Sequence, residues 1–467
     1  MPWSCGIRLL LPVHDREEQS HEQLLAGEAP KRRLTTTIEG IEMNRTWRFS
    51  LPVAAVTLGL TLPLLATPAQ AAGSQTIQLW THNGGNKQEL ADVNAVVKAF
   101  NASHKQYKVV VKAFPQINYN DAVVAAAASK QLPCLLDSDA PVIPAWAYAG
   151  YLAPLNLDPK VVKSINASAK GMWKGKLYSF GMYDAVVGLV TRKSTLAALG
   201  LRTPSLAKPW TLAEFNNALA KAKASGKYQY AIDLGTGWDG EWYPYGFSPF
   251  LQSFGGDLIN RKTYRNADNV LNGGKAVAFG TWFQGLFANG YAPKRTDATM
   301  RDNGLVNGSV AFSWNFFNQT QFDALKGDMI VLPPPNLGVK PVVGGGSWQW
   351  AMSSSCNAKT GANAFLKFMA QTKYFKMFSD TLSNLPVTAA ATKVSKVFGP
   401  GTDMNIAAVL SAKYAVIRPP TPAYPVIAKV FEAALKNIIN GADVQSELDN
   451  AVNQIDQNLQ DNHYYGF

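Results

Sequence analysis

The chain has 467 residues, of which 47% are hydrophobic and 16% charged, and its formal net charge is +12. This length exceeds one ordinary hydrophobic core and predicts two domains. The basic residues are scattered, without a Lys/Arg block or an RNA-binding signature, so the excess charge does not indicate a nucleic-acid binder. A weak preference for an anionic surface or ligand stays open.

The N-terminal part is typical of an exported protein. Residues 43–71 have the features of a secretory signal peptide: Arg45 and Arg48 form a basic start, an apolar run follows, and Ala69-Gln70-Ala71 is a small-residue cleavage site. The alternative is a membrane-anchoring helix. It is disfavoured because the apolar run has about 15 residues, whereas a bilayer-spanning helix needs roughly 20.

Translation is therefore expected to start at Met43, and the mature chain at Ala72. Residues 1–42 are mixed and aperiodic, and we interpret them as upstream sequence that is not part of the protein. No cysteine follows the cleavage site, which favours a free periplasmic protein over a lipid-anchored one. Only Cys134 and Cys356 remain after processing, so no disulfide framework is expected, and the sequence leaves open whether these two form a bond.

The first part of the mature chain alternates strands and helices. Residues 76–81 and 107–113 alternate apolar and polar side chains as half-buried strands do, and residues 88–101 and 120–131 have helical character. Residues 133–137 resemble a third strand. This βαβαβ order predicts a mostly parallel sheet covered by helices.

A well-signalled helix begins near residue 211. Thr211 can cap it, Glu214 completes a capping box, and Trp210 can pack onto Phe215 as a hydrophobic staple. Residues 235–274 are rich in Gly, Asn, Asp and aromatic side chains and are predicted to form long loops. Further helices are predicted at 275–289, 361–378, 425–440 and 443–460, and a Pro-rich then Gly-rich crossing between domains at 333–346.

The most specific motif lies at residues 175–219. It contains a Gly-Lys-Leu-Tyr-Ser run, Tyr183-Asp184, an apolar strand, an Arg-Lys-Ser-x-Leu helix start at 192–196 and Pro-Trp-Thr-Leu-x-Glu-Phe at 209–215. In this order these elements resemble the bacterial extracellular sugar-binding proteins of ATP-driven importers, the maltose-binding-protein-like family. The resemblance extends over nearly all of residues 74–460, but Cys134-Leu135-Leu136 replaces the family's usual aspartate and valines.

The resemblance implies an α/β, two-lobed periplasmic binding protein type II fold, in which each lobe is a mostly parallel sheet flanked by helices and the chain crosses a hinge several times. The N-terminal lobe is expected to comprise residues 72–185 and 343–388. The C-terminal lobe is expected to comprise residues 186–342 and 389–467.

Candidate ligand residues follow the predicted strands, because open α/β sheets bind ligands at the carboxyl ends of their strands. In the first lobe they are Asn83, Asp121, Asp137, Asp139, Tyr183 and Asp184. Either or both of Asp137 and Asp139 could instead be solvated or cap a helix, and Asp121 could cap the following helix. His82 is interpreted as a polar neighbour, and no metal is predicted because the five histidines lack metal-ligand spacing.

Tryptophans in glycine-rich segments are the second signal, because an indole offers a flat apolar face to the C–H side of a sugar. The resemblance implies that Trp314 and Trp348 line the cleft, with core packing as the alternative. The candidate set in this part of the chain is Trp238, Trp314, Asn315, Gly346, Ser347, Trp348 and Arg418.

These observations predict a periplasmic substrate-binding protein that captures a sugar between two lobes and delivers it to the membrane permease of an ABC importer. We expect a monomer with no cofactor and no catalytic residue. One alternative is a secreted carbohydrate-active enzyme of the glycoside hydrolase kind, for which Asp239 and Glu241 would be a candidate carboxylate pair. Another is a sugar-sensing adaptor for a membrane receptor.

Overall fold

The computed structural model describes residues 74–467. The predicted upstream segment 1–42 and the predicted signal peptide 43–71 lie outside the described residues.

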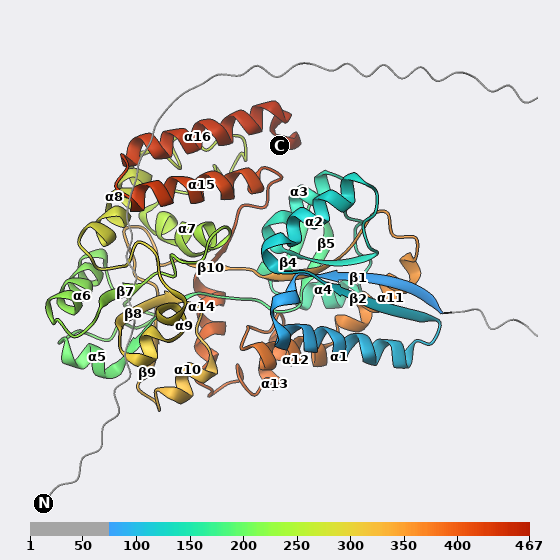
Figure 1. Cartoon of the computed structure of the whole chain (residues 1–467), viewed down its shortest axis with the longest axis horizontal. Coiled ribbons are helices and arrows are strands. Elements are labelled where there is room, and N and C mark those ends of the chain that lie inside the picture. Colours follow the sequence, from blue (N-terminus) through green and yellow to red (C-terminus); the bar gives the residue numbers. More distant parts are fainter. Residues whose placement is uncertain (1–73) are drawn as a thin grey trace, which may run out of the picture. The chain divides into compact units, whose positions relative to one another are not determined.

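A six-stranded mixed sheet, in the order β2-β1-β3-β11-β5-β4, organises the first part of the fold (Figure 1). Its strands are β1 (Gln75–Thr81), β2 (Tyr107–Ala113), β3 (Leu135–Asp139), β4 (Lys170–Trp173), β5 (Lys176–Gly181) and β11 (Trp348–Met352). The helices of this part are η1 (Asn83–Gly85), α1 (Lys87–Ser103), α2 (Gln116–Ala128), η2 (Ala140–Val142), α3 (Ile143–Tyr148), α4 (Pro159–Ser164), η3 (Ala167–Ala169), α11 (Lys359–Met369), α12 (Thr372–Leu382) and α13 (Ala389–Val394). Figure 1 shows α1 and α12 on one side of the sheet and α2 and α3 on the other.

A four-stranded sheet, in the order β7-β8-β6-β9, organises the second part, and a two-stranded sheet pairs β10 with β12. These strands are β6 (Gly188–Arg192), β7 (Tyr230–Asp233), β8 (Val310–Asn315), β9 (Met329–Leu332), β10 (Val343–Gly345) and β12 (Ala415–Ile417). The helices are α5 (Lys193–Ala198), α6 (Leu212–Ala224), α7 (Trp242–Phe254), α8 (Gly274–Ala288), α9 (Ala298–Asn307), α10 (Gln319–Ala324), α14 (Asn405–Tyr414), α15 (Tyr424–Ile439), α16 (Val444–Asp461) and η4 (His463–Gly466).

The expected two-lobed α/β class is confirmed, and the pairing pattern refines it. Strand β1 is parallel to both β2 and β3, as the βαβαβ order predicts. Strand β11, however, returns from late in the chain and is antiparallel to β3 and β5, and β6 is antiparallel to β8 and β9. Both sheets are therefore mixed rather than mostly parallel.

Each sheet packs its own hydrophobic core. Alternation along β3 divides the first sheet between two clusters, because successive side chains of a strand point to opposite faces. Leu135 packs with Phe180 and Trp350 on one face, and Leu136 packs with Tyr119 on the other. A separate and larger cluster surrounds the second sheet and includes the buried faces of α6, α7, α8, α15 and α16.

Helix α6 begins as its sequence predicts. Thr211 accepts from the backbone N–H of Glu214, and the Glu214 carboxylate in turn accepts from the Thr211 backbone N–H, which completes the capping box. The ring centroids of Trp210 and Phe215 lie 6.4 Å apart, so the predicted staple is also present.

Two helix predictions were wrong. Helix α7 lies inside 235–274, predicted as loops; every residue of α7 is buried, Pro249 included, so its sequence lacks the polar face that would have produced a helical period. The predicted helix 361–378 is two helices, α11 and α12, separated by Ala370 and Gln371.

Three chain segments that pass between the two sheets lie side by side. Asp184 forms an antiparallel bridge with Leu385, and Val186 forms one with Gly345. Gly344 is required here, because a Cβ at that position would lie 2.5 Å from the backbone oxygen of Tyr245 in α7. These segments bring the ends of both sheets to the same region.

Cys134 and Cys356 form a disulfide bond, which settles the question that the sequence left open. The bond joins the residue before β3 to a turn after β11, two strands that are already paired in the sheet.

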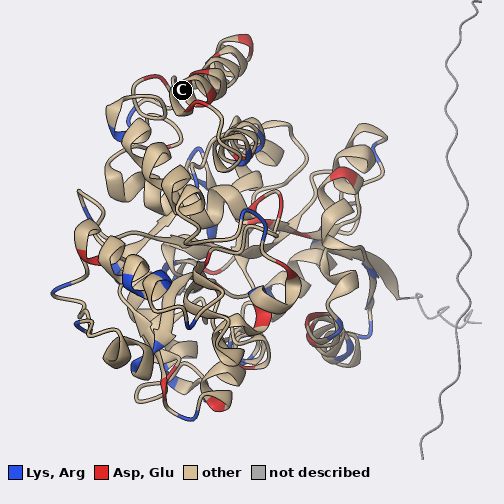
Figure 2. Cartoon of the chain, turned by 60° about the vertical axis from the view of Figure 1, so that its left-hand side comes forward, with Lys and Arg blue, Asp and Glu red and all other residues tan. Residues whose placement is uncertain are grey.

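Lys, Arg, Asp and Glu side chains are scattered over the described residues rather than gathered on one face (Figure 2). Within residues 74–467, no helix has both the length and the apolar character needed to cross a membrane.

Candidate ligand-binding site

The carboxyl ends of β1 and β3 meet the first residue of β11. Trp348 is the register partner of Asp139, and Trp350 that of Asp137. His82 directly follows β1, which is itself paired to β3. The sheet therefore gathers Asp137, Asp139 and Trp348, predicted separately from three parts of the sequence, around His82.

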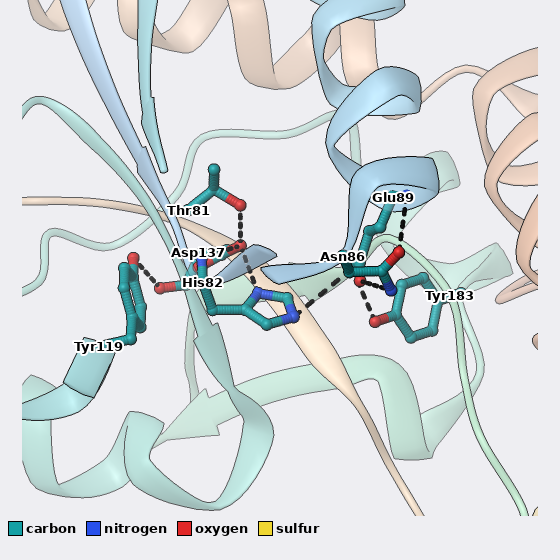
Figure 3. A network of polar contacts seen from close by, with 7 residues as sticks. All are labelled: Thr81, His82, Asn86, Glu89, Tyr119, Asp137 and Tyr183. Carbon is teal, nitrogen blue, oxygen red and sulfur yellow. Dashed lines mark hydrogen bonds and ion pairs between the residues drawn. The ribbon is translucent and has the colours of Figure 1, made fainter. Parts of the chain in front are cut away.

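Asp137 anchors a buried polar network (Figure 3). Its carboxylate accepts from the Thr81 hydroxyl at 2.6 Å, from the backbone N–H of His82 at 3.2 Å and from His82 Nδ1 at 2.8 Å. The Tyr119 hydroxyl donates to the Asp137 backbone oxygen at 2.8 Å. With no exposed surface and these donors on its oxygens, Asp137 orients its neighbours, and its contact with ligand stays a prediction.

Glu89 of α1 closes the other side of His82 (Figure 3). Its Oε1 lies 3.6 Å from His82 Nε2 and accepts from the Tyr183 hydroxyl at 2.8 Å. Burial raises the pKa of Glu89, whereas His82 and the hydrogen bond from Tyr183 lower it in part. Tyr183, a predicted ligand residue, is only 5% exposed and instead holds Glu89 in place.

Trp348 keeps part of its surface exposed. The His82 ring lies flat against its indole, with ring centroids 3.4 Å apart and planes 4° from parallel, and the Tyr119 ring meets it at an angle, 5.8 Å away. One side of Trp348 is thus occupied by protein side chains.

A second polar cluster surrounds Arg418, which follows β12. Its guanidinium contacts Asp139 through Nη1 at 3.1 Å and through Nη2 at 3.3 Å, and it also pairs with Glu241. Glu241 in turn accepts from the Tyr424 hydroxyl. The guanidinium also lies 4.9 Å from the ring centroid of Tyr245.

The carboxyl group of Glu241 is buried although a third of the side chain is exposed. Burial, opposed by the Arg418 charge, raises the pKa of Glu241 to about 7. Glu241 thus belongs to the site, although the sequence suggested it only as a member of a hydrolase pair. Asp239, the other member of that pair, forms ion pairs with Arg295 and Lys436 instead.

Asp184 is fully buried between the crossing segments. Its carboxylate accepts from the Ser168 hydroxyl at 2.5 Å, from the backbone N–H of Ala185 at 2.9 Å and from that of Gly346 at 3.0 Å. Burial raises the pKa of Asp184, and these three donors lower it in part. Asp184 is therefore held by protein donors at the crossings, and its contact with ligand stays a prediction.

Gly346 and Ser347 lie beside Asp184 in the crossing segments. Gly346 has φ +100°, a left-handed conformation that favours glycine, and it lines a pocket together with Ser168 and Arg418. Ser347 is 8% exposed, and its backbone oxygen accepts from the N–H of Ala140 at 3.1 Å.

Trp314 lies in the core of the second sheet, which favours the core-packing alternative over its prediction as a cleft residue. Its side chain has no exposed surface, its Nε1 donates to the Gly246 backbone oxygen at 2.8 Å, and its ring packs 4.5 Å from that of Phe250. Asn315 is buried as well, and its Oδ1 accepts from the next backbone N–H at 2.8 Å.

The exposed aromatic side chain at the end of β8 is instead Phe316, at 36% exposure. Its ring lies 5.6 Å from that of Trp238 and 5.5 Å from that of Tyr245, which also contacts Arg418. Trp238 is partly exposed, as its prediction requires. Sequence reasoning missed Phe316, although its place directly after a strand was the available signal.

The two remaining predicted ligand residues of the first lobe are Asp121 and Asn83. Asp121 is exposed in the second turn of α2, which begins at Gln116, so it does not cap that helix. Asn83 is buried at the start of η1, next to His82.

The described part of the chain, residues 74–467, contains no group of three or more His, Cys, Asp or Glu side chains placed to hold a metal ion. Its polar clusters pair carboxylates with His82, Arg418 and hydroxyl groups. Such an arrangement can hydrogen-bond a polyhydroxylated ligand beside an aromatic surface.

Comparisons with known proteins identify the family and the fold. The family described as "Bacterial extracellular solute-binding protein" matches residues 95–399. No curated protein matches the chain.

Solved structures resemble the chain in fold. The GacH receptor of Streptomyces glaucescens, determined unliganded and with acarbose, has a TM-score of 0.66 and 22% identity over 83% of this chain and 98% of its own. The cyclic α-maltosyl-1,6-maltose binding protein of Arthrobacter globiformis has a TM-score of 0.68 and 20% identity over 83% of this chain and 100% of its own. The sugar-binding protein MalE of Xanthomonas citri has a TM-score of 0.68 and 17% identity over 84% of this chain and 98% of its own.

Proposed function

Because the chain belongs to the bacterial extracellular solute-binding protein family, we propose that it captures a sugar and delivers it to the permease of an ABC importer. The observation that carries this proposal is the pairing of partly exposed aromatic side chains with polar side chains at the ends of both sheets. Trp348 lies beside Asp139 at the first sheet. Phe316 and Trp238 lie beside Tyr245 and the Arg418 cluster at the second.

The proposed ligand contacts are the groups that keep exposed surface or line the pocket at Gly346, namely Trp348, Phe316, Trp238, Asp139, Arg418 and Gly346. Aromatic faces would take the C–H side of the sugar, and the carboxylate and guanidinium groups would take hydroxyls. The similar structures include proteins named for binding acarbose, maltotriose and maltose, so a glucose-based mono- or oligosaccharide is the first class to test.

Transport would proceed by binding and closure. Lobes comprising residues 72–185 with 343–388 and residues 186–342 with 389–467 would each contribute contacts, and a ligand held by both would favour the closed state that a permease recognises. We propose a monomer for this role.

Export to an oxidising compartment is supported by the Cys134–Cys356 disulfide, since such bonds persist in the periplasm and outside the cell and are rare in the cytosol. We propose a periplasmic protein without a lipid anchor, released by cleavage after the signal at 43–71.

Isothermal titration calorimetry and thermal melting with glucose, maltose and maltotriose test this function. A sugar at 100 times its dissociation constant should add about 2.7 kcal/mol to the free energy of unfolding. Prolonged incubation followed by chromatography should return the sugar intact. Release of a shortened product would favour the hydrolase alternative. An absence of binding across neutral sugars, with the protein folded, would contradict the proposal.

A further inference from the structure

The His82 ring is held from three directions. Its Nδ1 lies 2.8 Å from Asp137 Oδ2, its Nε2 lies 3.6 Å from Glu89 Oε1, and its face lies on the Trp348 indole with centroids 3.4 Å apart. Asp137 Oδ2 lies within hydrogen-bond distance of His82 Nδ1, and the negative charge beside the ring favours its protonated form. Glu89, whose pKa burial raises, lies too far from Nε2 for a hydrogen bond and acts on the ring only through its charge.

The other groups facing His82 are Tyr119 of α2, the Tyr183 hydroxyl bound to Glu89, and Asp139 at the end of β3. Burial lowers the pKa of His82, but the charges of Asp137, Glu89 and Asp139 and the hydrogen bond to Asp137 more than offset it, so the pKa is raised above its ordinary value.

We propose that His82 is a positioning residue for ligand binding: its imidazolium, fixed by Asp137 and Glu89, supports the Trp348 indole and sets the orientation in which that indole meets a sugar ring. The proposal rests on the proposed sugar-binding function. A cation over an indole face is attracted by the ring quadrupole, most strongly where water is excluded, and His82 is only 3% exposed.

The proton on His82 gives this support a pH dependence. Because the pKa of His82 is higher in the folded protein than the unfolded value of 6.5, the support is fully present below about pH 6.5 and is lost as the pH rises through the folded pKa. Sugar affinity should fall over the same alkaline interval.

Intrinsic fluorescence tests the support without any ligand. A protonated imidazole quenches an indole that it touches, so the fluorescence of the wild-type protein should rise as the pH rises through the pKa of His82. This step should be absent from His82→Asn, whose amide can still donate to Asp137, and from Trp348→Phe. The matched control is His104→Gln, because His104 stacks on Phe100 rather than on a tryptophan; it should retain the step.

Calorimetric titration with maltotriose at pH 6 tests the effect on binding. His82→Asn should raise the dissociation constant about 5- to 30-fold, the range expected for a cation–π contact, and should lose the pH dependence of affinity seen in the wild type. His104→Gln should bind as the wild type does. Wild-type affinity in His82→Asn, or a fluorescence step that persists in it, would overturn the proposal.

Two further outcomes are informative. If His82→Asn does not fold, proton NMR of the wild-type protein decides the support: a histidine C–H signal displaced by the indole ring and titrating above pH 6.5 supports it, and an undisplaced signal overturns it. If the wild-type protein binds no sugar, the proposed function fails and the positioning role with it, whereas the fluorescence step still shows separately whether His82 supports Trp348.

Discussion

Removing the Cys134–Cys356 disulfide should destabilise the protein strongly while leaving its ligand affinity intact. The two cysteines are separated by 222 positions in the sequence. The chain-entropy relation for a loop of that length gives about 5 kcal/mol of stabilisation, near the upper end of the ~2–5 kcal/mol usually lost when a native disulfide is removed. Replacing both cysteines by serine should therefore lower the free energy of unfolding by several kcal/mol.

Affinity should survive because of where the bond lies. Strands β3 and β11 pair from Leu135 opposite Met352 at one end to Asp139 opposite Trp348 at the other. The cysteines flank the first end, and the candidate ligand residues lie at the second. The ladder between them remains hydrogen-bonded without the disulfide.

Urea unfolding followed by circular dichroism, with and without reductant, measures the stability, and sugar titration measures the affinity. Reductant should lower the unfolding midpoint of the wild type and leave that of the double serine variant unchanged. Equal midpoints for wild type and variant would refute the chain-entropy reasoning. An affinity loss in folded variant protein would refute the argument that the bond and the site are independent.

Four other outcomes are expected. Trp348→Ala should raise the sugar dissociation constant about 10- to 150-fold and lower the melting temperature less than Trp314→Ala does, because its side chain is partly exposed. A strongly lowered melting point with near-normal affinity would contradict this. Phe316→Ala should likewise weaken binding, whereas Trp314→Ala should cost about 3–5 kcal/mol of stability in calorimetric melts. Weaker binding in Trp314→Ala and lower stability in Phe316→Ala would instead support Trp314 as the cleft residue. The protonated Glu241 carboxyl stabilises the fold fully below about pH 4.5, and this stabilisation is lost as the pH rises through about 7. Glu241→Gln should therefore reduce the change in melting temperature between pH 5 and pH 8. An unchanged profile would show that another group causes the change. Small-angle scattering should show a smaller radius of gyration with saturating sugar, and an unchanged radius would argue against lobe closure.

Sequence patterns predicted the elements whose burial is one-sided. Strands β1 and β2 keep a polar face, so their alternation identified them. Helix α6 has a defined start, so the capping box at Thr211 identified it. Helix α7 and strand β8 are buried throughout, and neither retains a period. For that reason the orientation of Trp314, inside β8, could not be predicted from its neighbours.

The sequence placed polar residues near strand ends, but it did not show which protein groups these residues contact. Asp137 and Asp184 do follow the rule that polar residues gather at strand ends, yet both satisfy buried donors of the protein itself. Local sequence does not show which donors a carboxylate will meet. Those donors come from Thr81, Ser168 and Gly346, which are distant in the chain.

The hydrogen bonds that hold the crossing segments at Asp184 have a geometric consequence for ligand length. One carboxylate ties the segment at Ala185 to the segment at Gly346, while its backbone is bridged to Leu385. If the lobes rotate as proposed, this tied point would move least, and displacement would grow with distance from it. A sugar unit bound close to Gly346 would keep nearly the same contacts at every angle between the lobes. Units bound farther from Gly346 would be displaced more on closure, so discrimination between short and long oligosaccharides would depend on contacts away from this point.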